Sequence, residues 1–332
     1  MKNRKEHRVW IWKNFGKKAE PLRCLGVKVS QHGVVIAHKV WDEECRRNVY
    51  SASKSVTSCA VGFAIQEGLL SLEERLVDAF PQDLPETVGE NLEKATVRDL
   101  LTMCLGQDHG ELMGAQRPLY QEKDWVKLSL SLPFAYQPGS RFVYNNVGPY
   151  LAGVLVQRRA GCDLVSYLTP RLFDHLGITR PTWEVDPQGY TFGAGGLFFT
   201  LSELHTFGQF YLQNGLWNGR QLLSPAWVKE STTKQVENGQ QGYGYNVEEL
   251  RAEIGHILGV DNNHHLIMIG VGNLGHALLQ NFPFSQSGFT ECQTRGHISC
   301  IVKIIFCYST VTIQIDYFTS PRTKCISRCL LR

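Results

Sequence analysis

The pattern of apolar and polar positions predicts an alternation of strands and helices over the first 248 residues. Residues 22–29 and 34–40 are apolar, β-branched runs joined by Ser30-Gln-His-Gly33, which is typical of a β-hairpin. A long apolar segment from Ala52 to Glu67, ended by Gly68, predicts a helix. These elements indicate one continuous domain that combines sheet and helices.

Later parts of this region continue the helical pattern. Thr96-Val-Arg-Asp99 has the spacing of a capping box and predicts a helix over residues 100–104, stopped by Gly106. Residues 147–159 and 201–214 also have helical period.

The character of the chain changes near Glu248. Residues 249–258 predict a short amphipathic helix, residues 265–269 a buried strand, and residues 276–280 a second helix. From about Cys292 the chain has alternating apolar stretches, 301–306 and 311–315, and no helical period. We therefore predict three parts, which are residues 1–248, a β-α fragment over 249–290 and an unassigned, strand-prone tail over 291–332.

Composition narrows the class of protein. Hydrophobic residues make up 43% and charged residues 20% of the 332 positions, a balance typical of soluble globular proteins. A net charge of +3 is too small to indicate nucleic acid or an anionic membrane as a partner. No apolar run approaches the length of a membrane span or follows the basic N-terminus as a signal peptide would. We therefore expect a cytoplasmic protein.

The cysteines do not predict a metal site. Five of the ten lie in the last 41 residues, but only Cys325 and Cys329 approach the spacing of a zinc-binding pair. Unpaired thiols and no bound metal are the expected state.

Candidate chemistry begins with Ser51-Ala-Ser-Lys54 at the start of the predicted helix. A serine hydroxyl needs a base within hydrogen-bond reach, and spacing of three residues on a helix places the lysine amine on the same face. The helix N-terminus also offers backbone N–H groups to a developing oxyanion. Alone the motif is weak, because Ser-x-x-Lys arises by chance and helix starts favour serine.

Tyr144-Asn-Asn146 supports the assignment. A tyrosine phenol beside an ammonium group can move a proton between nucleophile and leaving group, and the asparagine amide can hold a substrate carbonyl. A tyrosine that merely packs in a turn is the alternative for this triplet alone. The two motifs together, 93 residues apart and each at the start of a helix, favour a catalytic site.

The combined motifs resemble class C β-lactamase-related serine hydrolases, which include penicillin-binding carboxypeptidases and esterases. The resemblance covers residues 10–247 and rests on five segments, namely Tyr50–Ser55, Arg98–Met103, Gln137–Asn146, Gly193–Leu197 and Gln221–Val228. It implies an antiparallel sheet with an all-helical lobe, in an α/β (α+β) fold. It also implies an acyl-enzyme mechanism without a cofactor, acting on a small or peptide-like amide, β-lactam or ester. Ser51 would attack, Lys54 and Tyr144 would handle protons, and Asn146 would orient the substrate.

One family motif is missing. The Lys/His-Thr/Ser-Gly triplet, whose strand donates the second oxyanion N–H, is not found after Tyr245. Loss of one such donor typically lowers kcat by about 10²–10³. We therefore expect a fold incomplete at its C-terminal core strands and an impaired activity.

A second resemblance concerns Gly270-Val-Gly-Asn-Leu-Gly275, which follows the predicted strand and opens a helix. Residues 250–289 resemble the start of the dinucleotide-binding domain of Rex-type redox-sensing repressors. Gly270, Gly272 and Gly275 would contact the pyrophosphate of NAD, and Glu291 lies near the distance of a ribose-binding acid. A strand–turn–helix fragment without bound nucleotide is the alternative.

Three functional hypotheses follow: an impaired serine hydrolase, a nucleotide-binding regulatory module, and a non-catalytic remnant that only binds ligands. Two families joined without a linker also suggest a fused or frame-shifted reading frame. The sequence leaves the exact substrate and the oligomeric state open.

Overall fold

The computed structural model describes residues 25–31, 33–237, 248–249, 266–269, 299–307 and 310–318. Contacts along the backbone group the chain into two compact units. We call residues 1–44 with 250–332 the sheet unit, and residues 45–249 the helical unit. The predicted division at residues 248 and 290 stays a prediction.

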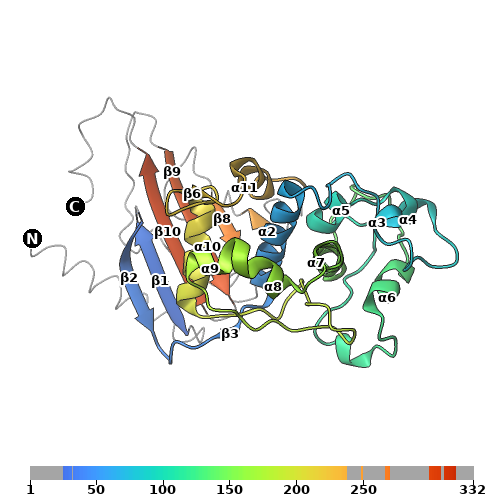
Figure 1. Ribbon diagram of the computed structural model, residues 1–332, viewed down its shortest axis with the longest axis horizontal. Helices are drawn as coiled ribbons and strands as arrows, with labels where there is room; N and C mark the ends of the chain where they lie inside the picture. The colour runs from blue at the N-terminus through green and yellow to red at the C-terminus, as the bar shows by residue number, and fades with distance from the viewer. Residues whose placement is uncertain are drawn as a thin grey trace, which may run out of the picture. The chain divides into compact units, whose positions relative to one another are not determined.

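The described part of the sheet unit consists of strands in the order β2-β1-β10-β9-β8. Their bounds are β1 (Gly26–Gln31), β2 (Val34–Val40), β8 (Leu266–Ile269), β9 (Ser299–Cys307) and β10 (Thr310–Phe318). The pairs β1–β2 and β9–β10 are antiparallel, whereas β1–β10 and β8–β9 are parallel. Figure 1 shows β1 and β2 in blue beside the red strands from the end of the chain.

The strand positions agree with the apolar patterns. The hairpin between β1 and β2 turns at Gly33, whose φ is +73°. β8 lies within the predicted strand 265–269, and β9 and β10 contain the alternating stretches 301–306 and 311–315. The sheet was expected to be antiparallel, but two of the pairs between described strands, β1–β10 and β8–β9, are parallel. The described sheet is therefore mixed.

The helical unit carries most of the described helices, seen in Figure 1. Its elements are β3 (Arg47–Asn48), η1 (Tyr50–Ala52), α2 (Ser53–Gln66), α3 (Leu76–Ala79), α4 (Glu90–Lys94), α5 (Val97–Thr102), η2 (Arg117–Leu119), α6 (Trp125–Ser131), α7 (Val147–Ala160), α8 (Leu164–Leu168), η3 (Thr169–Phe173), α9 (Asp174–Leu176), β4 (Phe198–Phe199), α10 (Leu201–Leu212), β5 (Leu216–Trp217), β6 (Arg220–Gln221), α11 (Pro225–Ser231) and β7 (Glu248–Glu249). β3 pairs with β4, and β5 with β6, in antiparallel fashion.

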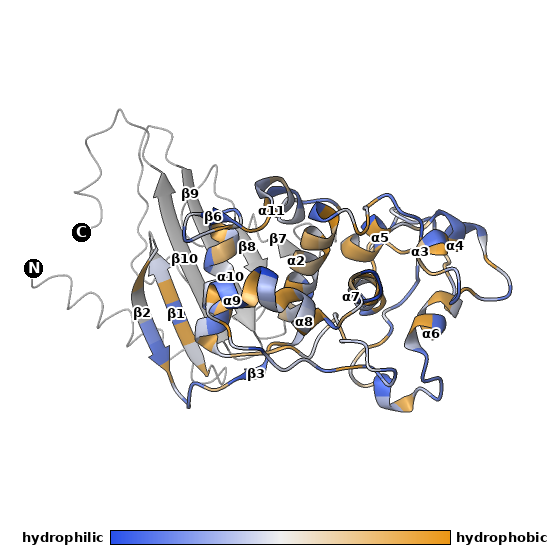
Figure 2. Cartoon of the chain, in the orientation of Figure 1, coloured by the Kyte–Doolittle hydropathy of each residue, from blue (hydrophilic) through white to orange (hydrophobic). Residues whose placement is uncertain are grey.

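Helices α2 and α7 form the centre of this unit. They pack against each other, and α7 also packs against α5. Residues 53–64 of α2 and 147–157 of α7 are buried without interruption. In Figure 2, both apolar (orange) and hydrophilic (blue) positions are seen on these helices. The apolar residues of α2 lie mainly in its second half, whereas its first half also buries polar side chains, namely Ser53, Lys54, Ser55, Thr57 and Ser58.

Helix positions largely follow the sequence. α2, α7 and α10 agree with the predicted helices to within about two residues. The capping box at Thr96 and Asp99 is present, but α5 starts directly after Thr96 and ends at Met103, so the predicted helix 100–104 was placed too late. Met103 adopts the left-handed conformation (φ +60°), which turns the chain before Gly106. Of the predicted helix 249–258, Glu249 lies in β7.

The remainder of that helix and the helix 276–280 fall outside the described residues. In the part of the chain that the structure describes, no helix is both long and apolar enough to cross a membrane.

Candidate active site

Ser51 lies in a tight turn between β3 and α2, which we call the nucleophile turn (residues 48–53). Tyr50 enters this turn with a φ of +47°, a conformation that non-glycine residues adopt only when their surroundings impose it. Its N–H donates to Asn48 Oδ1 (2.7 Å), and its carbonyl accepts a hydrogen bond from Ser53 Oγ (2.6 Å). The turn thus presents Ser51 at the start of the buried helix.

Lys54 is buried, with only 2% of its surface exposed. Its Nζ donates to Ser51 Oγ (3.1 Å), to Asn146 Oδ1 (2.7 Å) and to the carbonyl of Ala194 (2.6 Å). An ammonium group has three N–H donors, so these acceptors match its capacity. The arrangement fixes the amine beside the serine hydroxyl instead of leaving it to rotate.

Tyr144 approaches the same hydroxyl from the segment that precedes α7. Its OH donates to Ser51 Oγ at 2.8 Å, and Lys54 Nζ lies 5.2 Å from its ring centroid. Asn146 is the N-cap residue of α7, and its Nδ2 donates to the carbonyl of Leu112 (2.9 Å). That second bond determines the orientation of the amide, with Oδ1 facing Lys54.

The four residues that the sequence singled out for the hydrolase site therefore lie in one cluster. Sequence reasoning did not find the carbonyls of Ala194 and Leu112. Ala194 lies in the segment Gly193–Leu197, which was noted for its resemblance to the family. The sequence did not indicate what this segment does in the site. Leu112 gave no signal at all, because its position depends on a left-handed conformation (φ +56°) that its residue type does not indicate.

Close backbone packing supports the Ala194 side of the site. A Cβ on Gly193 would lie 2.7 Å from the carbonyl of Pro149, so only glycine fits there. The Gly193 carbonyl accepts a hydrogen bond from Thr57 Oγ1 (2.7 Å), one turn beyond Lys54 on α2. The segment is thereby held against α2 at two points.

The other candidate residues are not part of this cluster. Gly270, Gly272, Gly275 and Glu291 lie outside the described residues. Cys325 and Cys329 lie outside them as well, and within the described ranges no group of three or more His, Cys, Asp or Glu side chains could hold a metal ion.

His109 is an exposed residue that bonds to two acids. Its Nε2 lies 2.9 Å from Glu111 Oε1, and its Nδ1 contacts Asp108. Hydrogen bonds to Asp108 and Glu111 raise the pKa of His109. Asp108 is also exposed, and His175 is half-buried.

Solved structures show the same fold at low sequence identity. A putative 6-aminohexanoate-dimer hydrolase from Bacillus anthracis aligns with a TM-score of 0.59 at 19% identity, over 70% of this chain and 66% of that chain. The octameric penicillin-binding protein homologue from Pyrococcus abyssi has the same TM-score and identity, over 74% and 65%. A putative beta-lactamase from Bacteroides dorei DSM 17855 gives 0.58 at 22% identity, over 71% and 77%.

Curated sequences match this chain over a short stretch only. The redox-sensing transcriptional repressor Rex of Clostridioides difficile (strain 630) is 53% identical over 51 residues, and that of Clostridium botulinum (strain Hall) is 55% identical over the same length. The match spans 15% of this chain and about a quarter (24%) of each repressor.

The family model described as Beta-lactamase matches residues 17–288. This range includes the Ser51–Lys54 pair and the Tyr144–Asn146 triplet. It also extends beyond residue 247, which is the end of the resemblance described in the sequence analysis. The chain belongs to the beta-lactamase family.

Proposed function

We propose that the chain is a serine hydrolase that forms an acyl-enzyme at Ser51. The observation that carries this proposal is the placement of Lys54 Nζ and Tyr144 Oη at 3.1 and 2.8 Å from one hydroxyl oxygen. A weak nucleophile becomes effective when proton-accepting groups lie within hydrogen-bond distance. Membership of the beta-lactamase family supports the same chemistry.

In the proposed first step, Ser51 Oγ attacks the substrate carbonyl carbon and forms a tetrahedral intermediate. Either group takes the serine proton only in its deprotonated form, as the Lys54 amine or the Tyr144 phenolate. That group accepts the proton from Ser51 Oγ and passes it to the leaving nitrogen or oxygen as the C–N or C–O bond breaks. Water then attacks the acyl-serine ester, and its proton returns Ser51 to the hydroxyl form. The Ser51 backbone N–H, in the middle of η1, is the candidate for one oxyanion donor.

The proposed substrates are small-molecule or peptide-like amides, β-lactams or esters. The Asn146 amide has its Nδ2 bound to Leu112 and its Oδ1 bound to Lys54. A substrate carbonyl would therefore accept from Nδ2, which has a second N–H besides the one donated to Leu112. No cofactor or metal is needed for this route, and nucleic acid and membrane are not proposed as partners. The cytoplasm is its proposed location.

We further propose that acylation is slow. The Lys/His-Thr/Ser-Gly triplet is not found in the sequence after Tyr245, and a missing oxyanion donor typically lowers kcat by about 10²–10³. Labelling at a rate normal for the family would contradict this part of the proposal without affecting the assignment of Ser51.

The test is intact-mass analysis of the full chain after incubation with a reactive penicillin or a fluorophosphonate. The parent should gain the mass of one acyl or phosphonyl group, and Ser51→Ala should gain none. Ser58→Ala is the matched control, because Ser58 is buried on the same helix and its Oγ has no hydrogen-bond partner in the structure. Equal labelling of the parent and Ser51→Ala would overturn the proposal.

The alternative function is an NAD(H)-binding redox-responsive module keyed by Gly270, Gly272 and Gly275. The observation that favours it is the 53% identity to a Rex repressor over 51 residues. It is tested by NADH fluorescence and calorimetry with the full chain. Binding that is lost in Gly272→Val, while Ser51 labelling is unchanged, would establish it as a separate activity.

A further inference from the structure

Glu184 occupies a fixed position between two parts of the candidate site. Its N–H donates to the carbonyl of Gly196 (2.9 Å), and its own carbonyl accepts a hydrogen bond from the N–H of Phe192 (2.8 Å). A Cβ on Gly196 would lie 2.5 Å from Glu184 Cβ, so the glycine there allows the close approach. Glu184 is therefore anchored on the segment that also supplies Ala194 to Lys54.

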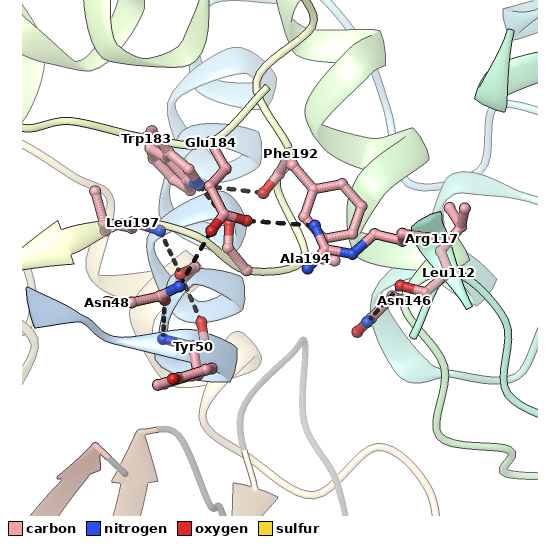
Figure 3. Close-up of polar contacts among 12 residues, drawn as sticks. Asn48, Tyr50, Leu112, Arg117, Asn146, Trp183, Glu184, Phe192, Ala194 and Leu197 are labelled. Carbon is pink, nitrogen blue, oxygen red and sulfur yellow. Dashed lines mark hydrogen bonds and ion pairs between the residues drawn. The ribbon is translucent and has the colours of Figure 1, made fainter. Parts of the chain in front are cut away.

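The carboxylate of Glu184 has a partner on each side, as Figure 3 shows. Oε1 accepts a hydrogen bond from Asn48 Nδ2 (3.3 Å), and Oε2 accepts one from Arg117 Nη1 (3.3 Å). The Arg117 guanidinium also lies 4.4 Å from the ring centroid of Phe192. Glu184 thus joins two segments that are 69 residues apart in the sequence.

The first partner leads to the nucleophile. Asn48 donates through Nδ2 to Glu184, and its Oδ1 accepts from the Tyr50 N–H at 2.7 Å. Because an amide has donors on one end and an acceptor on the other, the bond to Glu184 determines which end faces Tyr50. Through Oδ1, Asn48 supports the left-handed conformation of Tyr50, the residue directly before Ser51.

The second partner leads to the substrate-orienting amide. Arg117 begins η2, and its N–H donates to the carbonyl of Met113 (3.1 Å), next to Leu112. The Leu112 carbonyl accepts the bond that orients Asn146. Figure 3 shows the Arg117 side chain reaching from the side of Leu112 and Asn146 toward Glu184. A single carboxylate therefore connects the nucleophile turn with the segment that holds Asn146.

We propose that Glu184 is a positioning residue, whose carboxylate sets the geometry of Ser51 through Asn48 and that of Asn146 through Arg117. The inference rests on the proposed function of Ser51. Glu184 itself does not touch the reacting atoms. Its contribution follows from the sensitivity of catalysis to geometry, since a displacement of about 1 Å can lower a rate by about 10²-fold.

The first experiment compares the acylation of Ser51 in Glu184→Ala, Glu184→Gln and the parent. Glu184→Ala should lower the acylation rate constant by about 10- to 100-fold and leave the affinity for the probe within about threefold. Glu184→Gln should give a rate between those of the parent and Glu184→Ala, because its single amide oxygen can accept from Asn48 or from Arg117 but not from both. In an Asn48→Ala background, Glu184→Ala should have a smaller effect than in the parent, because the two residues act through one contact.

Glu67→Ala is the matched control. The Glu67 carboxylate also binds an arginine and is similarly exposed, but it bonds to Arg171 and Tyr167 at the other end of α2. It should leave the acylation rate constant unchanged. Equal losses in Glu67→Ala and Glu184→Ala would show a general loss of structure and would overturn the positioning role.

A second readout does not depend on hydrolase activity. In the variant Ser51→Cys, the nearby Lys54 ammonium should lower the pKa of the introduced thiol and speed its alkylation by iodoacetamide at pH 7. Adding Glu184→Ala should slow that alkylation at least threefold and move its pH profile upward, whereas adding Glu67→Ala should change neither. Site-resolved mass spectrometry follows the thiol at position 51 alone.

The outcomes separate the two proposals. If the parent is never acylated at Ser51, the proposed function fails, and the thiol pH profile still decides the role of Glu184. A profile identical with and without Glu184 would overturn the inference even if Ser51 is acylated normally.

Discussion

At the scale of single residues, the site depends on one buried ammonium group. Lys54 is 2% exposed, and a buried charge is tolerated only when its donors are matched by acceptors. Ser51, Asn146 and the Ala194 carbonyl provide that match. The same contacts that make the lysine acceptable in the interior therefore direct it at the candidate nucleophile.

Replacing Lys54 or Tyr144, the two residues proposed to handle protons, should change the free energy of unfolding and the rate of Ser51 acylation to different extents. Lys54→Met removes the donor from three acceptors and should lower the free energy of unfolding by about 1–3 kcal/mol. Tyr144→Phe removes one hydrogen bond from a half-buried group and should cost less than about 1 kcal/mol. Both variants should lose at least 10²-fold in the rate of Ser51 acylation, measured by intact mass beside urea unfolding. A Tyr144→Phe variant that is acylated at the parental rate would remove the phenol from the proposed proton path.

The thiol of Cys104 provides a pH-dependent signal near the end of α5. Burial raises the pKa of Cys104 from the ordinary value of 9.0 to about 11. The unfolded thiol loses its proton first as the pH rises, so this group should reduce stability between about pH 9 and 11 and have no effect below that range. At pH 8, alkylation of Cys104 in the native protein should be at least 10²-fold slower than that of the exposed Cys45, as measured by peptide mass spectrometry. Similar rates for the two thiols would contradict the burial of Cys104.

At the scale of elements, the orientation of α7 connects packing with the site. Asn146 caps α7, and Gly148 in the first turn lies directly against the backbone of α5. A Cβ on Gly148 would lie 2.3 Å from the carbonyl of Leu100, an atom that cannot move aside as a side chain could. Glycine at position 148 therefore allows the first turn of α7, which follows Asn146, to pack this close to α5.

Gly148→Ala should therefore affect both stability and the site. Overpacking of this kind typically costs about 1–3 kcal/mol, and a shift of α7 would move Asn146 away from Lys54. Thermal unfolding should show the loss, and the Ser51 acylation rate should fall with it. Gly114→Ala is the control, because its nearest neighbour is the end of a flexible side chain at 4.0 Å, and it should change stability by less than about 0.5 kcal/mol. Parental stability of Gly148→Ala would show that α5 and α7 are not in close contact.

At the scale of the whole molecule, the sequence predicted what depends on local pattern. The long, largely apolar segment of α2 and the capping box at Thr96 determine local structure, and both were predicted from the sequence. Ser51 and Lys54 were predicted as neighbours because one helix turn joins them. The contact with Tyr144, 93 residues away, was inferred from the family motifs.

Other features depend on tertiary contacts that residue type does not indicate. The carbonyl of Leu112 reaches Asn146 through a left-handed residue, and the Glu184 carboxylate joins two distant segments. Parallel pairing of β1 with β10 joins strands more than 270 residues apart, which apolar alternation alone does not specify. Local sequence pattern did not predict these long-range contacts.

The stability of the helical unit should depend on contacts remote from the site, and the ion pair between Asp83 and Arg158 is the clearest case. Asp83 is 5% exposed, and its two carboxylate oxygens accept from Nη1 and Nη2 of Arg158 at 2.5 and 3.0 Å. The pair connects the end of α7 with the segment after α3. Removal of one partner of a buried pair is strongly destabilising because the other charge stays buried.

Arg158→Gln should therefore lower the free energy of unfolding by about 2–4 kcal/mol, a little under the usual 3–5 because Arg158 is partly exposed. In the folded protein at low temperature, the acylation rate of Ser51 should stay within about threefold of the parent, because this ion pair shares no hydrogen bond with the site. Arg75→Gln is the matched control: its bond to Asp78 is exposed on both sides and screened by solvent, so this variant should unfold at the parental urea concentration. Urea unfolding and the intact-mass assay give the two quantities on the same samples. A loss of acylation in Arg158→Gln without a loss of stability would contradict this separation, because it would place the far end of α7 within the catalytic arrangement.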